Sequence, residues 1–253
     1  ARDRENARLI VTGDLTRFGY ADQFCFVSEF LGAKAALSHG RSIGVAEYDW
    51  SDRAIPGNHD HWPGRPVPVG PPPLATLRQL FRPFPFVGQL ESISDTVFVR
   101  FLGINSDAEV NSVERLFGIG SFTKQLADLA QGLPQRQQNE IRVLLIHHSR
   151  AHRGTATSME MNWNSRQTLD AFLVQCEVCV ILCGHAHVPH VGQFVAADDQ
   201  NHTLCAFEAR SGTTTLRDFI DDDDAANNSG HEPPLRPNTL LVHRLHQDGD
   251  QVF

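Results

Sequence analysis

The sequence contains very little lysine. Lys34 and Lys124 are the only two lysines among 253 residues, so nearly all of the basic side chains are arginines. This scarcity argues against chemistry that depends on lysine, such as a Schiff base or the phosphate-binding loop of nucleoside triphosphatases. The net charge of −8 also argues against nucleic acid as a partner, because a nucleic-acid backbone requires a basic surface.

Long apolar runs and a regular cysteine framework are missing too. No run approaches the roughly 18 apolar residues that a membrane span requires, and no secretory signal is visible. The five cysteines are Cys25, Cys176, Cys179, Cys183 and Cys205. Their odd number favours reduced thiols, so we predict a cytoplasmic protein. The lack of long apolar runs predicts that the protein does not enter a membrane. The closely spaced Cys176, Cys179 and Cys183 could ligate a metal or a cluster, but their position along an apolar run favours packing.

Four apolar segments end in residues that can ligate metal ions. The segment at 180–183 leads into Gly184-His185-Ala186-His187, and earlier segments end in Gly13-Asp14, in Gly57-Asn58-His59-Asp60 and in His147-His148. Strands alternate with helices through most of the chain, which predicts an α/β fold whose first part is a largely parallel sheet. The carboxyl ends of such strands share one rim, where ligands bind. Carboxylate, amide and imidazole donors together suit Mn, Fe or Zn.

Hydrophobic periodicity predicts the remaining elements of a single domain over residues 1–253. We expect strands at 9–14, 54–56, 96–102, 142–146, 180–183, 191–195, 203–209, 212–215 and 239–245, and helices at about 21–37, 74–81, 121–132 and 169–176. A proline-rich segment at about 61–90 is interpreted as a stiff insertion. Its aromatic residues Trp62, Phe81, Phe84 and Phe86 form either a wall over the site or a small separate cluster. Arg17, Trp62 and Arg65 are candidates for substrate contact.

The four motifs in this order resemble the calcineurin-like metallophosphoesterases, over residues 9–190. The resemblance implies a four-layer α/β/β/α sandwich with a two-metal centre. The ligands that it implies are Asp14, Asn58, His147, His185 and His187. Asp14 would bridge two divalent ions, and His187 would belong to the second of them. His59 would face the substrate, where it stabilises the phosphoryl group or protonates the leaving oxygen. Asp60 either favours the imidazolium form of His59 or, as we prefer, stabilises the loop.

The sequence departs from the family pattern in two places. The family's first motif, Asp-x-His, occurs nowhere in the chain, although it should precede Gly13-Asp14 at the end of an earlier strand. We therefore expect that an N-terminal strand is missing, together with two ligands of the ion near His187. Ser149 also stands where the family frequently has proline after its paired histidines.

These motifs predict a metal-dependent phosphoesterase, and more specifically a phosphodiesterase. A metal-bridging hydroxide would attack the phosphate ester, and the substrate would be a small ester such as a nucleotide. The alternative is a non-catalytic protein-interaction scaffold on the same fold, because the absent Asp-x-His leaves its metal site incomplete. A nuclease is disfavoured by the negative net charge.

Overall fold

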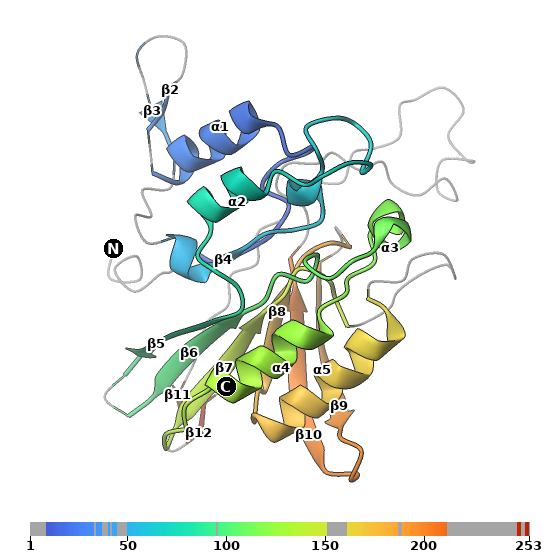
Figure 1. The fold of residues 1–253 in the computed structure, drawn as a ribbon. Coiled ribbons are helices and arrows are strands. Elements are labelled where there is room, and N and C mark those ends of the chain that lie inside the picture. The colour runs from blue at the N-terminus through green and yellow to red at the C-terminus, as the bar shows by residue number, and fades with distance from the viewer. Residues whose placement is uncertain are drawn as a thin grey trace, which may run out of the picture.

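A six-stranded mixed sheet is the largest element of the fold (Figure 1). The computed structural model describes residues 9–32, 34–36, 40, 42–44, 50–94, 96–150, 161–186, 189–211, 247–248 and 251–252. The strand order is β5-β6-β7-β8-β10-β9. The strands are β5 (Phe86–Ser92), β6 (Phe98–Gly103), β7 (Glu140–Leu145), β8 (Val180–Cys183), β9 (His190–Ala197) and β10 (Thr203–Arg210).

The four central strands run parallel, and the two edge strands run antiparallel to their neighbours. Backbone bonding continues past the ends of β7 and β8, because the N–H of Gly184 donates to the carbonyl of His147 over 3.0 Å. This bond sets the two histidine-bearing loops side by side at the carboxyl edge of the sheet.

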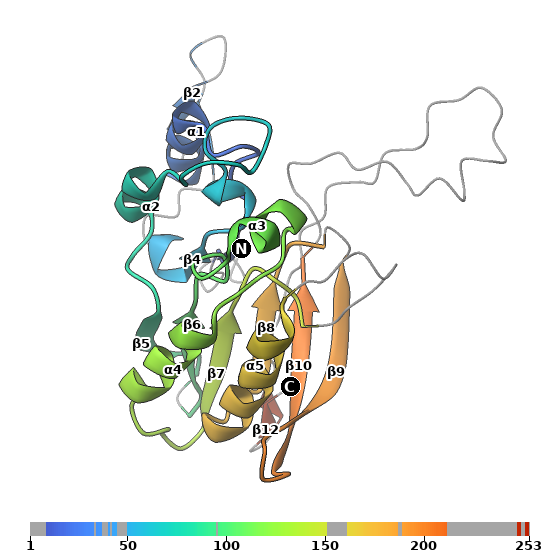
Figure 2. The same ribbon diagram turned by 45° about the vertical axis from the view of Figure 1, so that its right-hand side comes forward.

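Helices α4 (Thr123–Gly132) and α5 (Trp163–Gln175) cover one face of the sheet (Figures 1 and 2). Leu126 and Leu129 of α4 and Leu169 of α5 are buried against strand residues such as Ile181. Burial of one apolar side of each helix explains why sequence periodicity finds both of them.

A smaller unit carries the first two motifs. Strand β1 (Val11–Thr12) pairs in parallel with β4 (Ala54–Ile55) as a two-stranded sheet. Helices α1 (Ala21–Leu31) and α2 (Leu74–Leu80) pack near it around a core that includes Phe24. Ile55 is fully buried against the second face of the six-stranded sheet, among Val143, Leu145 and other residues. The two sheets are thus joined through an apolar contact.

Short elements complete the described chain. They are β2 (Ala35–Ala36), β3 (Ser42–Ile43), the 3₁₀ turns Trp50–Arg53 and His59–His61, α3 (Ser112–Phe117), β11 (Gln247–Asp248) and β12 (Gln251–Val252). No helix among the described residues is long and apolar enough to cross a membrane.

Two sequence predictions about these elements were wrong. The first helix ends at Leu31 instead of 37, because Gly32 ends it and residues 35–36 pair as β2. The proline-rich insertion ends in strand β5, which is an integral edge of the main sheet. Of the two interpretations of the aromatic residues, these phenylalanines fit packing better than a wall over the site: Phe81 and Phe86 are core residues of two clusters, with Phe84 packed against both.

The mixed α/β class is as predicted, whereas the four-layer sandwich stays a prediction. The expectation that all four motifs share the rim of one sheet also needs correction, because two of them follow strands of the small sheet. The strands expected at 212–215 and 239–245 lie outside the described residues, and so does His187.

Candidate metal centre

Asp14 reaches the site through a turn with left-handed backbone. The turn directly follows β1, where Gly13 has φ 100° and Asp14 has φ 54°. A Cβ atom on Gly13 would lie 2.4 Å from Nδ1 of His147, so only glycine allows this close approach. The turn therefore brings the Asp14 carboxylate next to the His147 ring.

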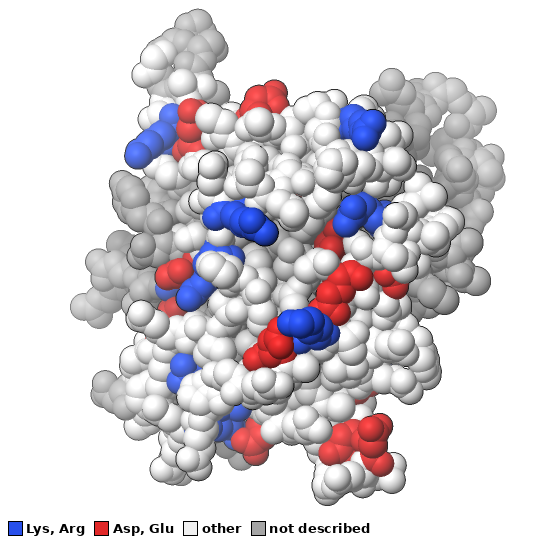
Figure 3. Space-filling model, viewed as in Figure 1, with Lys and Arg blue, Asp and Glu red and all other residues white. Residues whose placement is uncertain are grey.

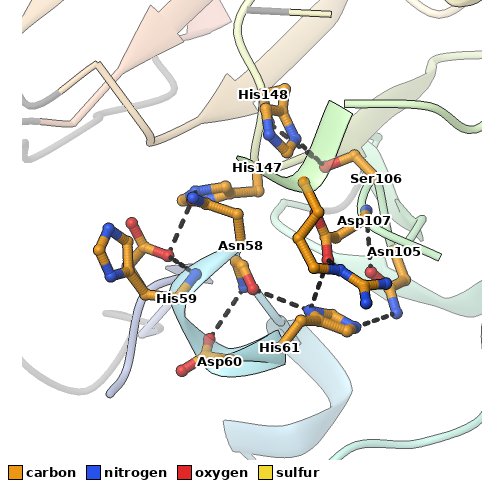
Figure 4. A network of polar contacts seen from close by, with 12 residues as sticks. Asn58, His59, Asp60, His61, Asn105, Ser106, Asp107, His147 and His148 are labelled. Atoms are coloured by element: carbon orange, nitrogen blue, oxygen red, sulfur yellow. Dashed lines mark hydrogen bonds and ion pairs between the residues drawn. The ribbon is translucent and has the colours of Figure 1, made fainter. Parts of the chain in front are cut away.

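Asn58 and His59 come from the turn after β4. Asn58 is buried, and the 3₁₀ turn that follows it starts at His59. The backbone N–H of His59 donates to Oδ1 of Asp14 over 3.0 Å. The first two motifs therefore hold each other in place. Figure 4 shows the Asn58–His59 turn beside His147.

His147 and His185 supply imidazole nitrogens from the ends of β7 and β8. Nε2 of His147 lies 3.3 Å from Oδ1 of Asp14 and 3.0 Å from Oδ1 of Asn58. Nδ1 of His185 lies 3.1 Å from the same Asn58 oxygen and 3.3 Å from Nε2 of His147. Two oxygens and two nitrogens thus converge on one point.

These four donor atoms fit a metal ion. Ligand atoms held at roughly 2 Å from a common ion lie about 3 Å from one another, which is the spacing found here. Nδ1–H of His147 donates to the carbonyl of Thr12 over 2.7 Å, which leaves Nε2 with a lone pair for a metal. Among the described residues, one group of acidic, histidine or cysteine side chains is close enough to hold an ion, namely Asp14, His147 and His185.

The electrostatics of this point favour a cation. Burial opposes the charged form of the His147 ring, but the Asp14 carboxylate, the Thr12 carbonyl and the Asp60 carboxylate together outweigh burial and raise the pKa of His147 to about 9. The protein therefore attracts positive charge to the place where the four donors meet. A proton and a metal ion would compete for it.

Asp60 stabilises the loop that carries Asn58 and His59. Its carboxylate is fully buried and accepts hydrogen bonds from the N–H groups of Leu15, Thr16 and Gly57 and from the hydroxyl of Thr16. Burial, followed by the nearby Asp14 carboxylate, raises the pKa of Asp60 to about 6. These bonds tie the Asp14 loop to the Asn58 loop and agree with the loop role preferred from the sequence.

A sequence model of the family described as "Calcineurin-like phosphoesterase" matches residues 1–189. The chain belongs to this calcineurin-like phosphoesterase family. Members of the family typically depend on two metal ions, which agrees with the donor cluster.

Other known proteins add little to this family assignment. No curated protein matches the chain significantly. One similar solved structure is titled as a "Putative 5'-Nucleotidase from Staphylococcus aureus in complex with alpha-ketoglutarate", with 15% identity and a TM-score of 0.33. The similarity covers 68% of this chain and 40% of that one, so this chain spans about two fifths of that protein's length.

The chain also contains a buried polar network that sequence reasoning missed (Figure 4). Nδ1–H of His61 donates to the carbonyl of Gly57 over 2.9 Å, and Nε2 of His61 lies 3.0 Å from the Asn105 amide nitrogen. Burial lowers the pKa of His61 to about 4, so this ring is neutral. Nδ1 of the buried His148 lies 2.7 Å from Oγ of Ser106. A signal was present in the sequence, because Asn105 and Ser106 also follow an apolar strand.

Proposed function

We propose that this phosphoesterase is a metal-dependent phosphodiesterase acting on a small phosphate ester. The observation that carries the proposal is the convergence of Asp14, Asn58, His147 and His185 donors beside His59. These four residues would hold one divalent ion, and Asp14 and His187 would contribute to a second. Mn, Fe and Zn suit this donor set.

Divalent ions bound there would neutralise phosphoryl charge and lower the pKa of water near the phosphorus. The protein's own residues orient the reaction. Asp14 and Asn58 are fixed by the paired turns, and His147 is fixed by its bond to Thr12. His59 stands beside this cluster and would protonate the leaving oxygen or stabilise the phosphoryl group.

A small ester, with nucleotides among the candidates, suits the charge distribution better than a nucleic-acid polymer. On the face drawn in Figure 3, the basic and acidic side chains of the described residues are interspersed. A polymer backbone would instead favour a continuous basic stripe, and the net charge of −8 offers no general attraction for one.

Hydrolysis of bis(p-nitrophenyl) phosphate tests the proposal. The purified protein should be assayed with Mn, Fe or Zn, before and after treatment with EDTA, and alongside the monoester p-nitrophenyl phosphate. We expect metal-dependent activity that is greater on the diester. Asp14→Asn should abolish it, whereas Asp128→Asn, on the exposed side of α4, should not.

Activity that survives chelation would contradict the proposal. Activity confined to the monoester would contradict the diester preference alone. A protein that binds no metal and hydrolyses neither ester would support the scaffold alternative instead.

A further inference from the structure

We infer that Trp62 is a positioning residue that holds the His59 ring in its working orientation through face-to-face stacking. This inference rests on the proposed function, in which His59 acts on the substrate. It replaces the sequence-based suggestion that Trp62 contacts the substrate itself.

Contacts with Asp14, Arg17 and the Trp62 ring restrain His59. Its backbone N–H donates to Oδ1 of Asp14, and its Nδ1 lies 2.8 Å from the carbonyl oxygen of Arg17. Its ring stacks on the indole of Trp62, with centroids 4.5 Å apart and planes inclined by 20°. The first contact fixes the main chain, the second fixes one ring atom, and the third fixes the plane of the ring.

The Arg17 contact also determines which ring nitrogen of His59 can act on the substrate. A carbonyl oxygen only accepts hydrogen bonds, so Nδ1 of His59 carries the hydrogen. The exchangeable position left for the substrate is therefore Nε2. A half-turn of the ring about the Cβ–Cγ bond would put carbon atoms where the two nitrogens lie, and the stacked indole blocks such rotation because the imidazole would have to swing through it.

Trp62 is itself placed by aromatic packing. The Phe18 ring lies 5.5 Å from its indole, and the N–H of Gly64 donates to the carbonyl of Phe18 over 2.9 Å. Within the described residues, the buried indole N–H has no hydrogen-bond partner. Because its polar atom is unused, Trp62 contributes its ring face alone. His59 and Phe18 both lie against this ring, which argues against stacking of the substrate there.

Leaving-group dependence tests the inference in the full chain loaded with metal. An ester with an alkyl leaving group needs protonation of the leaving oxygen, whereas p-nitrophenolate leaves without it. Trp62→Ala should therefore slow alkyl-ester hydrolysis by about tenfold or more, with a much smaller effect on the p-nitrophenyl ester. Trp62→Phe should restore the rate, because it keeps a ring face. Metal content should equal that of the wild type.

A double-mutant cycle separates positioning from general destabilisation. In a His59→Ala background, Trp62→Ala should cost no further activity, because its effect acts through His59. Equal losses for both leaving groups, or a full additional loss in the His59→Ala background, would overturn the inference.

A spectroscopic readout keeps the test independent of turnover. In long-range ¹H–¹⁵N spectra, the His59 ring of the wild type should show one tautomer, with the hydrogen on Nδ1 and ring-current-shifted carbon-bound protons. Trp62→Phe should keep this pattern, and Trp62→Ala should average it. If the wild type hydrolyses no ester, the proposed function fails, while these spectra still decide the positioning role. An unchanged tautomer in Trp62→Ala would refute it.

Discussion

Nε2 of His147 lies 3.3 Å from Oδ1 of Asp14, although the two residues follow strands of different sheets. The site therefore forms only when the small β1–β4 unit docks on the six-stranded sheet through Ile55 and its neighbours. Metal binding and docking are consequently coupled, since an ion held by both units binds the docked form alone.

This coupling predicts that metal stabilises the fold. Adding Mn or Zn at about 100 times its Kd should stabilise the protein by about 2.7 kcal/mol, seen as a higher Tm in calorimetry. Asp14→Asn should lose most of this shift, because it removes the charged donor between the two units. The surface variant Asp128→Asn should retain the shift. An equal shift in Asp14→Asn would show that the metal binds elsewhere.

Gly57 offers a steric test of the close approach between the Asp14 carboxylate and the His147 ring. A Cβ atom at this position would lie 2.2 Å from Oδ1 of Asp14 and 2.7 Å from Cε1 of His147. Gly57→Ala should therefore destabilise the protein by roughly 1–3 kcal/mol and weaken metal binding, as measured by denaturant unfolding and titration calorimetry.

Gly132→Ala is the matched control for Gly57→Ala, because a Cβ atom on Gly132 would meet nothing within 4 Å. Gly132 ends helix α4, so the substitution should be neutral or stabilise by a few tenths to about 1 kcal/mol. Similar losses for both variants would indicate that Gly57 is not specially constrained by the site.

The hydrogen bonds of Asp60 predict that its substitution destabilises the protein even in the absence of metal. All four of its partners donate hydrogen bonds, so they require an acceptor at both carboxylate oxygens. Asp60→Asn would turn an amide NH₂ toward N–H donors and should cost about 2 kcal/mol or more in metal-free protein. Chemical unfolding in the presence of EDTA measures this cost. An unchanged unfolding midpoint would mean that the two loops are held together by other contacts.

The candidate site was predictable from the sequence because its chemistry is local. Each motif places a ligand-type side chain directly after an apolar strand, and Gly13 and Gly57 mark the close approaches. Which sheet each strand joins depends on long-range pairing, which periodicity does not report. The expectation of a single shared rim failed for this reason.

Helix α3 shows a second limit of sequence reasoning. Three of its apolar residues, Val113, Leu116 and Phe117, are 57–63% exposed, so it has no buried stripe for periodicity to detect. It is stabilised instead by the capping box between Asn111 and Glu114, which is a local signal that went unused.

The buried ion pairs of Glu140 predict how stability depends on pH. Oε1 of Glu140 accepts from Nε of Arg100 at 2.7 Å and from Nε of Arg142 at 3.2 Å, and Oε2 accepts from the N–H of Gln137. Burial alone would raise the pKa of Glu140, but the Gln137 N–H and the two guanidinium groups outweigh burial and hold it below its ordinary value of 4.5.

A lowered pKa in the folded state means that the unfolded chain takes up the proton more readily as the solution is acidified. The stability contributed by ionised Glu140 is therefore complete above pH 4.5 and is lost as the pH falls through the folded-state pKa. Glu140→Gln should be less stable than the wild type at pH 7, and the difference should shrink steadily below pH 4.5. Urea unfolding of both proteins across this range measures the trend. A difference that stays constant or grows in acid would show that Glu140 is not ionised in the folded protein.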